Sequence, residues 1–141
     1  MAIREHPKIG TILMCDYDTG FMPPEMVKRR PVVVISPKIA ARPGLCTVVP
    51  LSTTAPNPVL QFHCQIDLPD QAPDWLDRNG VWVKADMMAA VALSRLDFIR
   101  LPKRRRGKRE YCFSTVSDDN IKKIRASVLA GLGLAHLTKS L

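Results

Sequence analysis

This 141-residue sequence has no closely paired cysteines, no long apolar run and few aromatic residues. None of its four cysteines lies in a C-x-x-C pair, so the closely spaced thiolates of a structural zinc site are missing. The first residues are polar, unlike a secretory signal, and the apolar stretch at 128–134 is too short to cross a bilayer. We therefore expect a cytoplasmic protein with reduced thiols, no membrane association, and no metal or other cofactor.

Acidic residues are scarce relative to basic ones. The sequence holds 21 lysines and arginines against 13 aspartates and glutamates, which gives a formal charge of +8. Such a surplus favours a polyanionic partner, either nucleic acid or an acidic protein, although it also serves solubility alone. The 46% apolar content is typical of a folded protein, and the length fits a single domain over residues 1–141.

Short β-branched runs separated by proline and glycine predict a loop-rich β protein. The expected strands cover residues 9–17, 31–36, 45–52, 61–68, 81–86, 93–101 and 111–116. The period then changes to that of a helix, for which Ser117 is a suitable N-cap. The apolar face of this helix carries Ile121, Ile124, Val128 and Leu132. This order predicts a mainly β fold, a small β-barrel closed by a C-terminal helix.

Two of the expected strands carry polar side chains at one end. Arg29 and Arg30 precede one strand, and Ser52 and Thr53 end the next. If the strands are neighbours, these groups meet at one rim of the sheet. There the planar arginine fork could donate two hydrogen bonds to phosphate oxygens while the hydroxyls orient a ribose, but arginine stays protonated and is a poor base. The same residues are equally typical of a charged strand edge and a serine/threonine turn.

Three sequence blocks, in their order and separation, resemble the MazF/PemK family of type II toxin–antitoxin toxins. The blocks are the region from Gly10 through Glu25 to Ser36, the run Val48–Thr53, and Ala85–Met88 with the strand and helix that follow. The resemblance spans about residues 9–132. It implies a compact SH3-like (CcdB/MazF-like) β-barrel, a homodimer, and a growth-inhibiting toxin neutralised by a cognate antitoxin protein. It also implies a metal-independent endoribonuclease that cleaves single-stranded RNA at a short motif through attack of the 2′-hydroxyl.

The resemblance places Arg30 at the position of the family's principal catalytic arginine. Ser52 stands where a threonine is usual, with Thr53 beside it, so the hydroxyl is kept and the methyl that restrains χ1 is lost. Lys84 stands where some members have a second catalytic arginine, and lysine cannot fork onto two oxygens. Asp86 matches an acidic residue that some members use near the substrate.

No histidine takes the place of a general base. Pro24 occupies a position where some members have histidine. Glu25, beside it, is the nearest carboxylate candidate for a base, or alternatively a solvated loop charge. His6 and His136 lie in the terminal segments. His63 is better explained as a structural or surface side chain, although it is the one histidine that could approach a groove.

A second basic feature is the run of residues 100–109, which holds seven of the 21 basic residues and no acid. On a hairpin tip it could hold RNA phosphates electrostatically, dock an acidic antitoxin, or remain a solvated loop. Among the few aromatic residues, Phe21 is the best contact for an RNA base, and Trp82 fits the core better. The expected RNA-binding residues are Arg29, Phe21, Lys103, Arg104, Arg105, Arg106, Lys108 and Arg109.

Two other functions fit the same scaffold. One is a protein-directed inhibitor, because the barrel also resembles that of the CcdB gyrase poisons, which cut nothing. The other is a nucleic-acid-binding module made inactive by the changes at Ser52 and Lys84. A fold alone does not separate these functions. The arginine facing hydroxyls across the sheet favours the nuclease, since a gyrase poison has no need of it.

Overall fold

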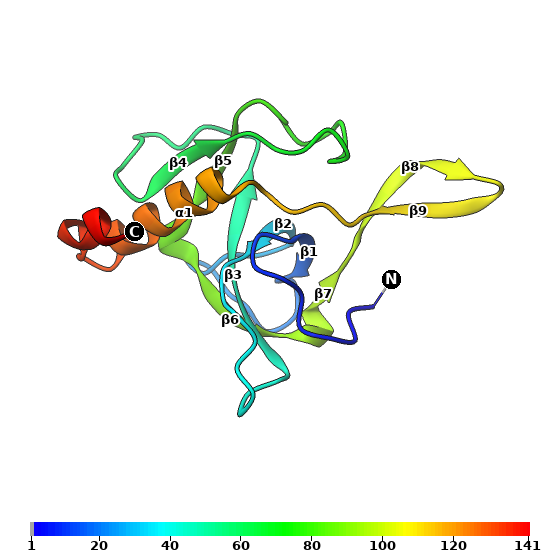
Figure 1. Cartoon of the computed structure of the whole chain (residues 1–141), viewed down its shortest axis with the longest axis horizontal. Coiled ribbons are helices and arrows are strands. Elements are labelled where there is room, and N and C mark those ends of the chain that lie inside the picture. The colour runs from blue at the N-terminus through cyan, green and yellow to red at the C-terminus, as the bar shows by residue number, and fades with distance from the viewer. Residues whose placement is uncertain (1) are drawn as a thin grey trace.

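The computed structural model describes residues 2–141, and the side chains of all of these except residues 103–105. An antiparallel sheet carries its strands in the order β4–β5–β3–β2–β1–β7, with β6 paired to β3 off this path (Figure 1). Strands β8 and β9 form a separate hairpin, and the helix α1 follows. The elements are β1 (Ile12–Asp16), β2 (Arg29–Val34), β3 (Leu45–Ser52), β4 (His63–Ile66), β5 (Val81–Lys84), β6 (Ala89–Ala92), β7 (Leu96–Asp97), β8 (Ile99–Arg105), β9 (Lys108–Cys112) and α1 (Asp118–Gly131), with 3-10 turns η1 (Ala85–Met87), η2 (Leu93–Arg95) and η3 (Ala135–Ser140).

The predicted mainly β fold with a C-terminal helix is confirmed. Over the residues that the structure describes, no ladder joins the two end strands β4 and β7. Within the same residues, no helix has the length and apolar character needed to cross a membrane.

The single strand expected over residues 93–101 is wrong. Residues 89–92 form β6, which pairs with β3, and residues 93–95 make a 3-10 turn. The short strand β7 then ends just before Phe98, and the longer strand β8 begins just after it. Alanine-rich β6 has little intrinsic strand propensity, so its conformation depends on pairing with β3 rather than on a local signal.

The helix α1 follows its predicted course. The N-cap Ser117 accepts a hydrogen bond from the backbone N–H of Asn120 at 3.2 Å. The predicted apolar face is confirmed as far as Val128, which packs against the core. The prediction is wrong for Leu132, which is exposed. The helix has already ended there, and Gly133 takes the left-handed conformation, with a φ of +75°, that commonly follows a helix C-terminus.

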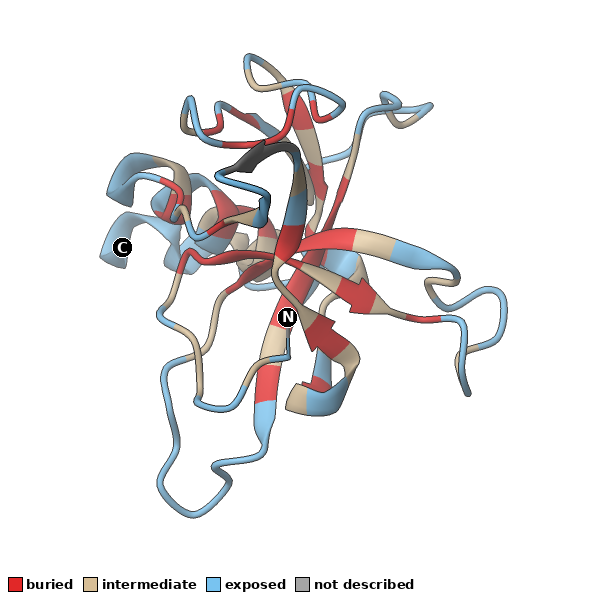
Figure 2. Cartoon of the chain, turned by 90° about the vertical axis from the view of Figure 1, so that its right-hand side faces the viewer, coloured by how far each residue is buried: buried red, intermediate tan, exposed pale blue. Residues whose placement is uncertain are grey.

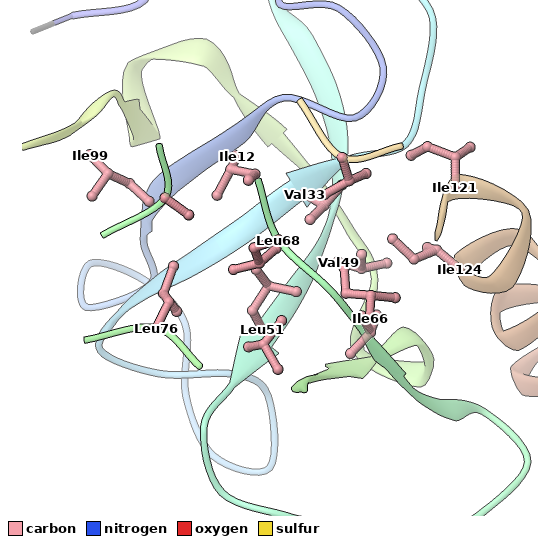
Figure 3. Close-up of a cluster of buried hydrophobic side chains, with 14 of the residues drawn as sticks. Ile12, Val33, Val49, Leu51, Ile66, Leu68, Leu76, Ile99, Ile121 and Ile124 are labelled. Carbon is pink, nitrogen blue, oxygen red and sulfur yellow. The ribbon is translucent and has the colours of Figure 1, made fainter. Parts of the chain in front are cut away.

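The central strands β2 and β3 bury both of their faces. On one face, Val33 belongs to an apolar cluster that α1 covers with Ile121 and Ile124 (Figure 3). On the other face, Val32 belongs to a second cluster that includes Tyr17. Buried positions gather where the strands cross, whereas the loops and the C-terminal segment are exposed (Figure 2). A strand buried on both sides reads as a continuous apolar run, so polar side chains are left to the strand ends.

The β8–β9 hairpin projects from the sheet at the opposite end of the molecule from α1 (Figure 1). Its turn residues Arg106 and Gly107 both have positive φ angles, 51° and 75°, as in the tight turns that match strand twist. The predicted hairpin is therefore confirmed, with β9 ending at Cys112 rather than at Val116.

Candidate active site

Strand register brings the predicted catalytic residues of three strands to one face of the sheet. Val32 of β2 and Pro50 of β3 form the last pair of their ladder, and Arg30 and Ser52 each lie two residues beyond that pair, on the same face as it. Ser52 in turn pairs with Trp82 of β5. Directly opposite residues share a face, and alternate residues of one strand do too. Arg30, Ser52 and Lys84 therefore lie on the same face.

Arg30 is half-buried and partly fixed by the loop that precedes β2. Its Nε donates a hydrogen bond to the carbonyl oxygen of Val27 at 3.2 Å. This bond uses the ε nitrogen and not the two terminal nitrogens, which are the pair that forms a planar fork on phosphate. The arrangement orients the guanidinium at the end of β2 without consuming its terminal donors.

Ser52 forms the turn that the sequence allowed as an alternative. Its Oγ accepts a hydrogen bond from the Thr54 backbone N–H at 3.1 Å and lies 3.2 Å from the Thr54 carbonyl oxygen. The turn interpretation is confirmed for this residue. The side chain remains half-exposed at the rim of the sheet, with Thr53 fully exposed beside it.

A cleft of about 510 Å³ brings together residues that lie far apart in the sequence. Phe21 and Glu25 come from the loop between β1 and β2, and Asp86 comes from η1. The Oε1 atom of Glu25 accepts a hydrogen bond from the Met22 backbone N–H at 3.1 Å, and the side chain is otherwise exposed. Three predicted site residues thus line one cleft, although no sequence signal linked them to each other. The complete lining is Tyr17, Phe21, Pro24, Glu25, Met26, Asp86, Met87, Met88 and Ala89.

Arg95 holds the loop that carries Phe21. Its Nη1 donates hydrogen bonds to the carbonyl oxygens of Asp16 at 3.0 Å and Thr19 at 2.6 Å. Its guanidinium lies 4.8 Å from the centroid of the Phe21 ring, and the Tyr17 ring meets Phe21 edge-on at 5.1 Å. Sequence reasoning missed Arg95, because its partners are 76 and 79 residues away and nothing local marks it.

Asp86 is positioned by a nearly buried histidine and by the end of α1. Its Oδ1 lies 4.0 Å from Nε2 of His63, whose side chain is only 9% exposed. The Leu60 N–H donates to the Nδ1 of His63 at 3.0 Å, so Nε2 carries the proton of the neutral ring. Gly131 packs so closely that a Cβ there would lie 3.4 Å from the Asp86 Cα. His63, predicted as a structural or surface side chain that could approach a groove, is thus nearly buried and lies beside an acid that lines the cleft.

A family model described as the PemK-like, MazF-like toxin of type II toxin–antitoxin systems matches residues 8–130. This chain belongs to that family. An uncharacterised protein of Haemophilus influenzae is 35% identical over 108 residues, covering 68% of this chain and 73% of that protein. Solved structures share the fold. MazF from Deinococcus radiodurans has a TM-score of 0.61 at 21% identity, covering 91% of this chain and 97% of its own. A mycobacterial endoribonuclease in complex with its cognate antitoxin has a TM-score of 0.59 at 20% identity, covering 91% and 96%.

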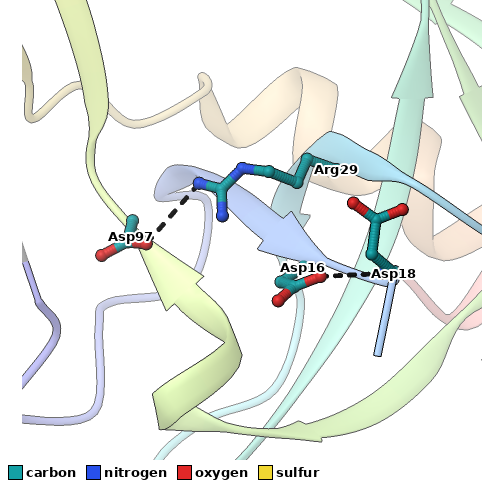
Figure 4. A network of polar contacts seen from close by, with 4 residues as sticks. All are labelled: Asp16, Asp18, Arg29 and Asp97. Atoms are coloured by element: carbon teal, nitrogen blue, oxygen red, sulfur yellow. Dashed lines mark hydrogen bonds and ion pairs between the residues drawn. The ribbon is translucent and has the colours of Figure 1, made fainter. Parts of the chain in front are cut away.

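In this PemK-like, MazF-like chain the two adjacent arginines point to opposite faces of the sheet. Arg29 pairs with Asp16 of β1, and its Nη2 lies 3.6 Å from Oδ2 of Asp97 (Figure 4). Asp16 also accepts a hydrogen bond from the Asp18 backbone N–H at 2.8 Å. Arg29 is therefore separated from Arg30 by the thickness of the sheet, and it belongs to the side that faces β7 and β8.

The predicted RNA-binding residues of the basic run lie on the hairpin, away from the cleft. Arg106, Lys108 and Arg109 are exposed. The side chains of Lys103, Arg104 and Arg105 lie outside the described residues. The predicted RNA contacts of this PemK-like, MazF-like chain thus lie in three places: Phe21 at the cleft, Arg29 beside Asp97, and the basic run at the hairpin.

Three of the four cysteines, Cys15, Cys46 and Cys112, are buried in the core, and Cys64 packs against it partly buried. Burial raises the pKa of Cys15 and of Cys46 to about 11 each, so both thiols are protonated at neutral pH. A protonated, buried thiol is not a nucleophile. Among the described residues, no three histidine, cysteine, aspartate or glutamate side chains gather as a metal site would require.

Proposed function

We propose that this chain is a metal-independent endoribonuclease that cleaves single-stranded RNA at a short motif by attack of the ribose 2′-hydroxyl. The observation that supports the proposal is that Arg30 and Ser52 lie on the same face of the sheet, each two residues beyond the Val32–Pro50 pair. The family match to type II toxins supports the same activity and a growth-inhibiting role. The shape of the site follows from strand register, so it is a property of the fold and not of a mobile side chain.

The chemistry assigns Arg30 to the phosphate. The O2′ atom attacks phosphorus, the bond from phosphorus to O5′ breaks, and the products are a 2′,3′-cyclic phosphate and a 5′-hydroxyl. The terminal nitrogens of Arg30 would stabilise the charge that gathers on the non-bridging oxygens. Ser52 and Thr53 would orient the ribose and the phosphate from the rim of the sheet, and Lys84 would add positive charge on the same face.

Proton transfer requires a base for the 2′-hydroxyl and an acid for O5′. Glu25 is our candidate for the base, because its carboxylate is exposed in the cleft and anchored through one oxygen. Asp86, held beside His63, would position the nucleotide or help in proton transfer. Phe21, fixed by Arg95, would contact a base in the same cleft.

The proposal includes the state of the protein in the cell. We propose one toxin domain over residues 1–141, a closed SH3-like barrel, a cytoplasmic homodimer, and inhibition by a cognate antitoxin protein. The mycobacterial endoribonuclease whose structure contains its antitoxin supports the last point.

The test is incubation of purified protein with a long single-stranded RNA in excess EDTA, followed by sequencing of the product ends. Wild type should cut at a short recurrent motif and leave 2′,3′-cyclic phosphates, whereas Arg30→Ala should leave the RNA intact. Arg125→Ala is the matched control, because it removes an exposed arginine from α1, outside the predicted catalytic and RNA-binding residues, and should retain cleavage. Intact RNA at high wild-type concentration would contradict the nuclease and favour a protein-directed inhibitor or an inactive binder.

A further inference from the structure

Aromatic side chains gather at the base of the β8–β9 hairpin. Arg100 of β8 pairs directly with Tyr111 of β9, so these two side chains share a face. Phe98 and Phe113, each two residues along, extend the same face. The rings of Phe98 and Phe113 are 4.8 Å apart between centroids, and those of Tyr111 and Phe113 are 6.5 Å apart. We call Phe98, Tyr111, Phe113 and Trp75 the aromatic platform.

Trp75, from the loop between β4 and β5, lies beside the base of β8. It lines a cleft of about 300 Å³ together with Phe98 and Arg100. Trp75 is 53% exposed and Phe113 is 59% exposed, so neither serves as a core residue. The core contact of the hairpin base is made on its other face, where Ile99 and Cys112 are buried. The platform therefore leaves two aromatic surfaces in solvent that the fold does not need.

The hairpin beside the platform is strongly basic, whereas Trp75 directly follows Asp74, which forms an ion pair with Arg78. Residues 100–109 hold seven basic residues and no acid. The acid that lines the cleft, Asp97, faces Arg29 at 3.6 Å, and Glu110 on β9 is the one other acid of the hairpin. Exposed aromatic rings beside a basic strip are the two elements of sequence-tolerant binding to single-stranded nucleic acid, because every base has a π-face and every nucleotide a phosphate.

We propose that the aromatic platform and the hairpin form a second RNA-binding surface, distinct from the cleft, that holds single-stranded RNA flanking the cleavage site. The rings stack on unpaired bases, and the hairpin cations contact the phosphates. This inference rests on the proposed function for its ligand. A contact with another protein through aliphatic side chains fits the C-terminal segment better than the platform, because exposed leucines gather there. These are Leu132, Leu134, Leu137 and Leu141.

The surface should supply affinity without selecting a motif. Substrates that extend beyond the cleaved motif should then bind more tightly than short ones, with a lower KM and the same cleavage position. The contribution of the hairpin cations should fall with rising salt, because phosphate contacts release counterions. The contribution of the rings should depend on the presence of bases.

The experiment measures fluorescence anisotropy with a labelled 2′-O-methyl RNA, which the enzyme cannot cleave by 2′-hydroxyl attack. Phe113→Ala and Trp75→Ala should each weaken binding about tenfold, the scale of one lost base stack. Phe113→Tyr keeps a ring and should retain affinity. Leu137→Ala, an exposed apolar side chain at the other end of the chain, is the matched control and should bind as wild type. Removing the bases, with an abasic oligonucleotide, should weaken binding by wild type more than binding by either alanine variant, because each variant has already lost one of the rings.

Several outcomes would overturn the inference. Equal affinities for wild type and both alanine variants would show that the rings do not touch RNA. Unchanged RNA binding with an altered mass by light scattering would make this face a contact between protein chains. Thermal melts identify a variant that has lost its fold, and Trp75→Ala then carries the test in place of Phe113→Ala. A wild type that binds this RNA and never cuts ordinary RNA would refute the proposed nuclease and leave the platform standing.

Discussion

Replacing Arg95 with methionine should loosen the loop that carries Phe21. The change removes hydrogen bonds to the carbonyl oxygens of Asp16 and Thr19 and the contact of the guanidinium with the Phe21 ring. Hydrogen bonds from a charged donor contribute about 1.5–3 kcal/mol and an exposed cation–π contact about 0.5–1 kcal/mol. Because Arg95 is half-buried, solvent screens part of this sum, and we expect a loss of about 2 kcal/mol in the free energy of unfolding.

Thermal unfolding provides the assay. An unfolding entropy of about 2.1 cal/mol/K per residue gives about 0.3 kcal/mol/K for a chain of this length, so Tm should fall by about 7 °C. Arg125→Met, on the exposed face of α1, is the control and should melt within about 1 °C of wild type. If Arg95→Met has the same Tm as wild type, the loop does not depend on this side chain, and Phe21 is not held in place by Arg95.

Three further changes test the helix end, the core and the rim of the sheet. Gly131→Ala should raise the free energy of unfolding by about 0.5–1 kcal/mol in urea titrations, because alanine favours the helix and the added Cβ meets its neighbours at 3.4 Å or more; a lower value would show that the helix end is too tightly packed. Burial raises the pKa of Cys15 and Cys46 to about 11, so their stabilisation is complete below the unfolded thiol pKa of about 9 and is lost as pH rises toward 11. The urea midpoint of unfolding should therefore fall as pH rises from about 9 to about 11, and it should fall less steeply in the variant that carries both Cys15→Ala and Cys46→Ala. Ser52→Thr should keep RNA cleavage and Ser52→Ala should lower it, since the hydroxyl is the shared group; equal rates would remove Ser52 from the site.

Local signals in the sequence were sufficient to predict several helices and strands. The helix period and the Ser117 cap predicted α1, because both depend on neighbours within four residues. The runs of β2 and β3 predicted two adjacent strands, and their ladder puts Arg30 and Ser52 beyond the same end pair, Val32–Pro50. That the arginine and the hydroxyl share one end and one face of the sheet was therefore predictable from strand periodicity once the two strands were taken as neighbours.

Other parts of the structure depend on contacts that no local pattern encodes. Strand β6 is built from alanine and exists through its pairing with β3. The cleft forms because the loop after β1 folds back over η1, which brings Phe21 and Glu25 to Asp86. Arg95 acts on a loop more than seventy residues earlier. Such tertiary partners become visible only when the chain is folded.

The two-sided burial of β2 leaves its alignment under-determined by hydrophobicity. If β2 slipped by one residue so that Arg29 took the place of Arg30, valine would replace valine at positions 33 and 34, whereas Pro31 would take the buried place of Val32. The residues of β2 that are not valine then distinguish the two alignments. Pro31 has no N–H and so tolerates only some ladder positions, and Arg29 faces Asp97 in one alignment alone. A single-residue insertion near β2 would therefore exchange the arginine at the site and keep most of the core filled, with the loss of one buried valine, Val32.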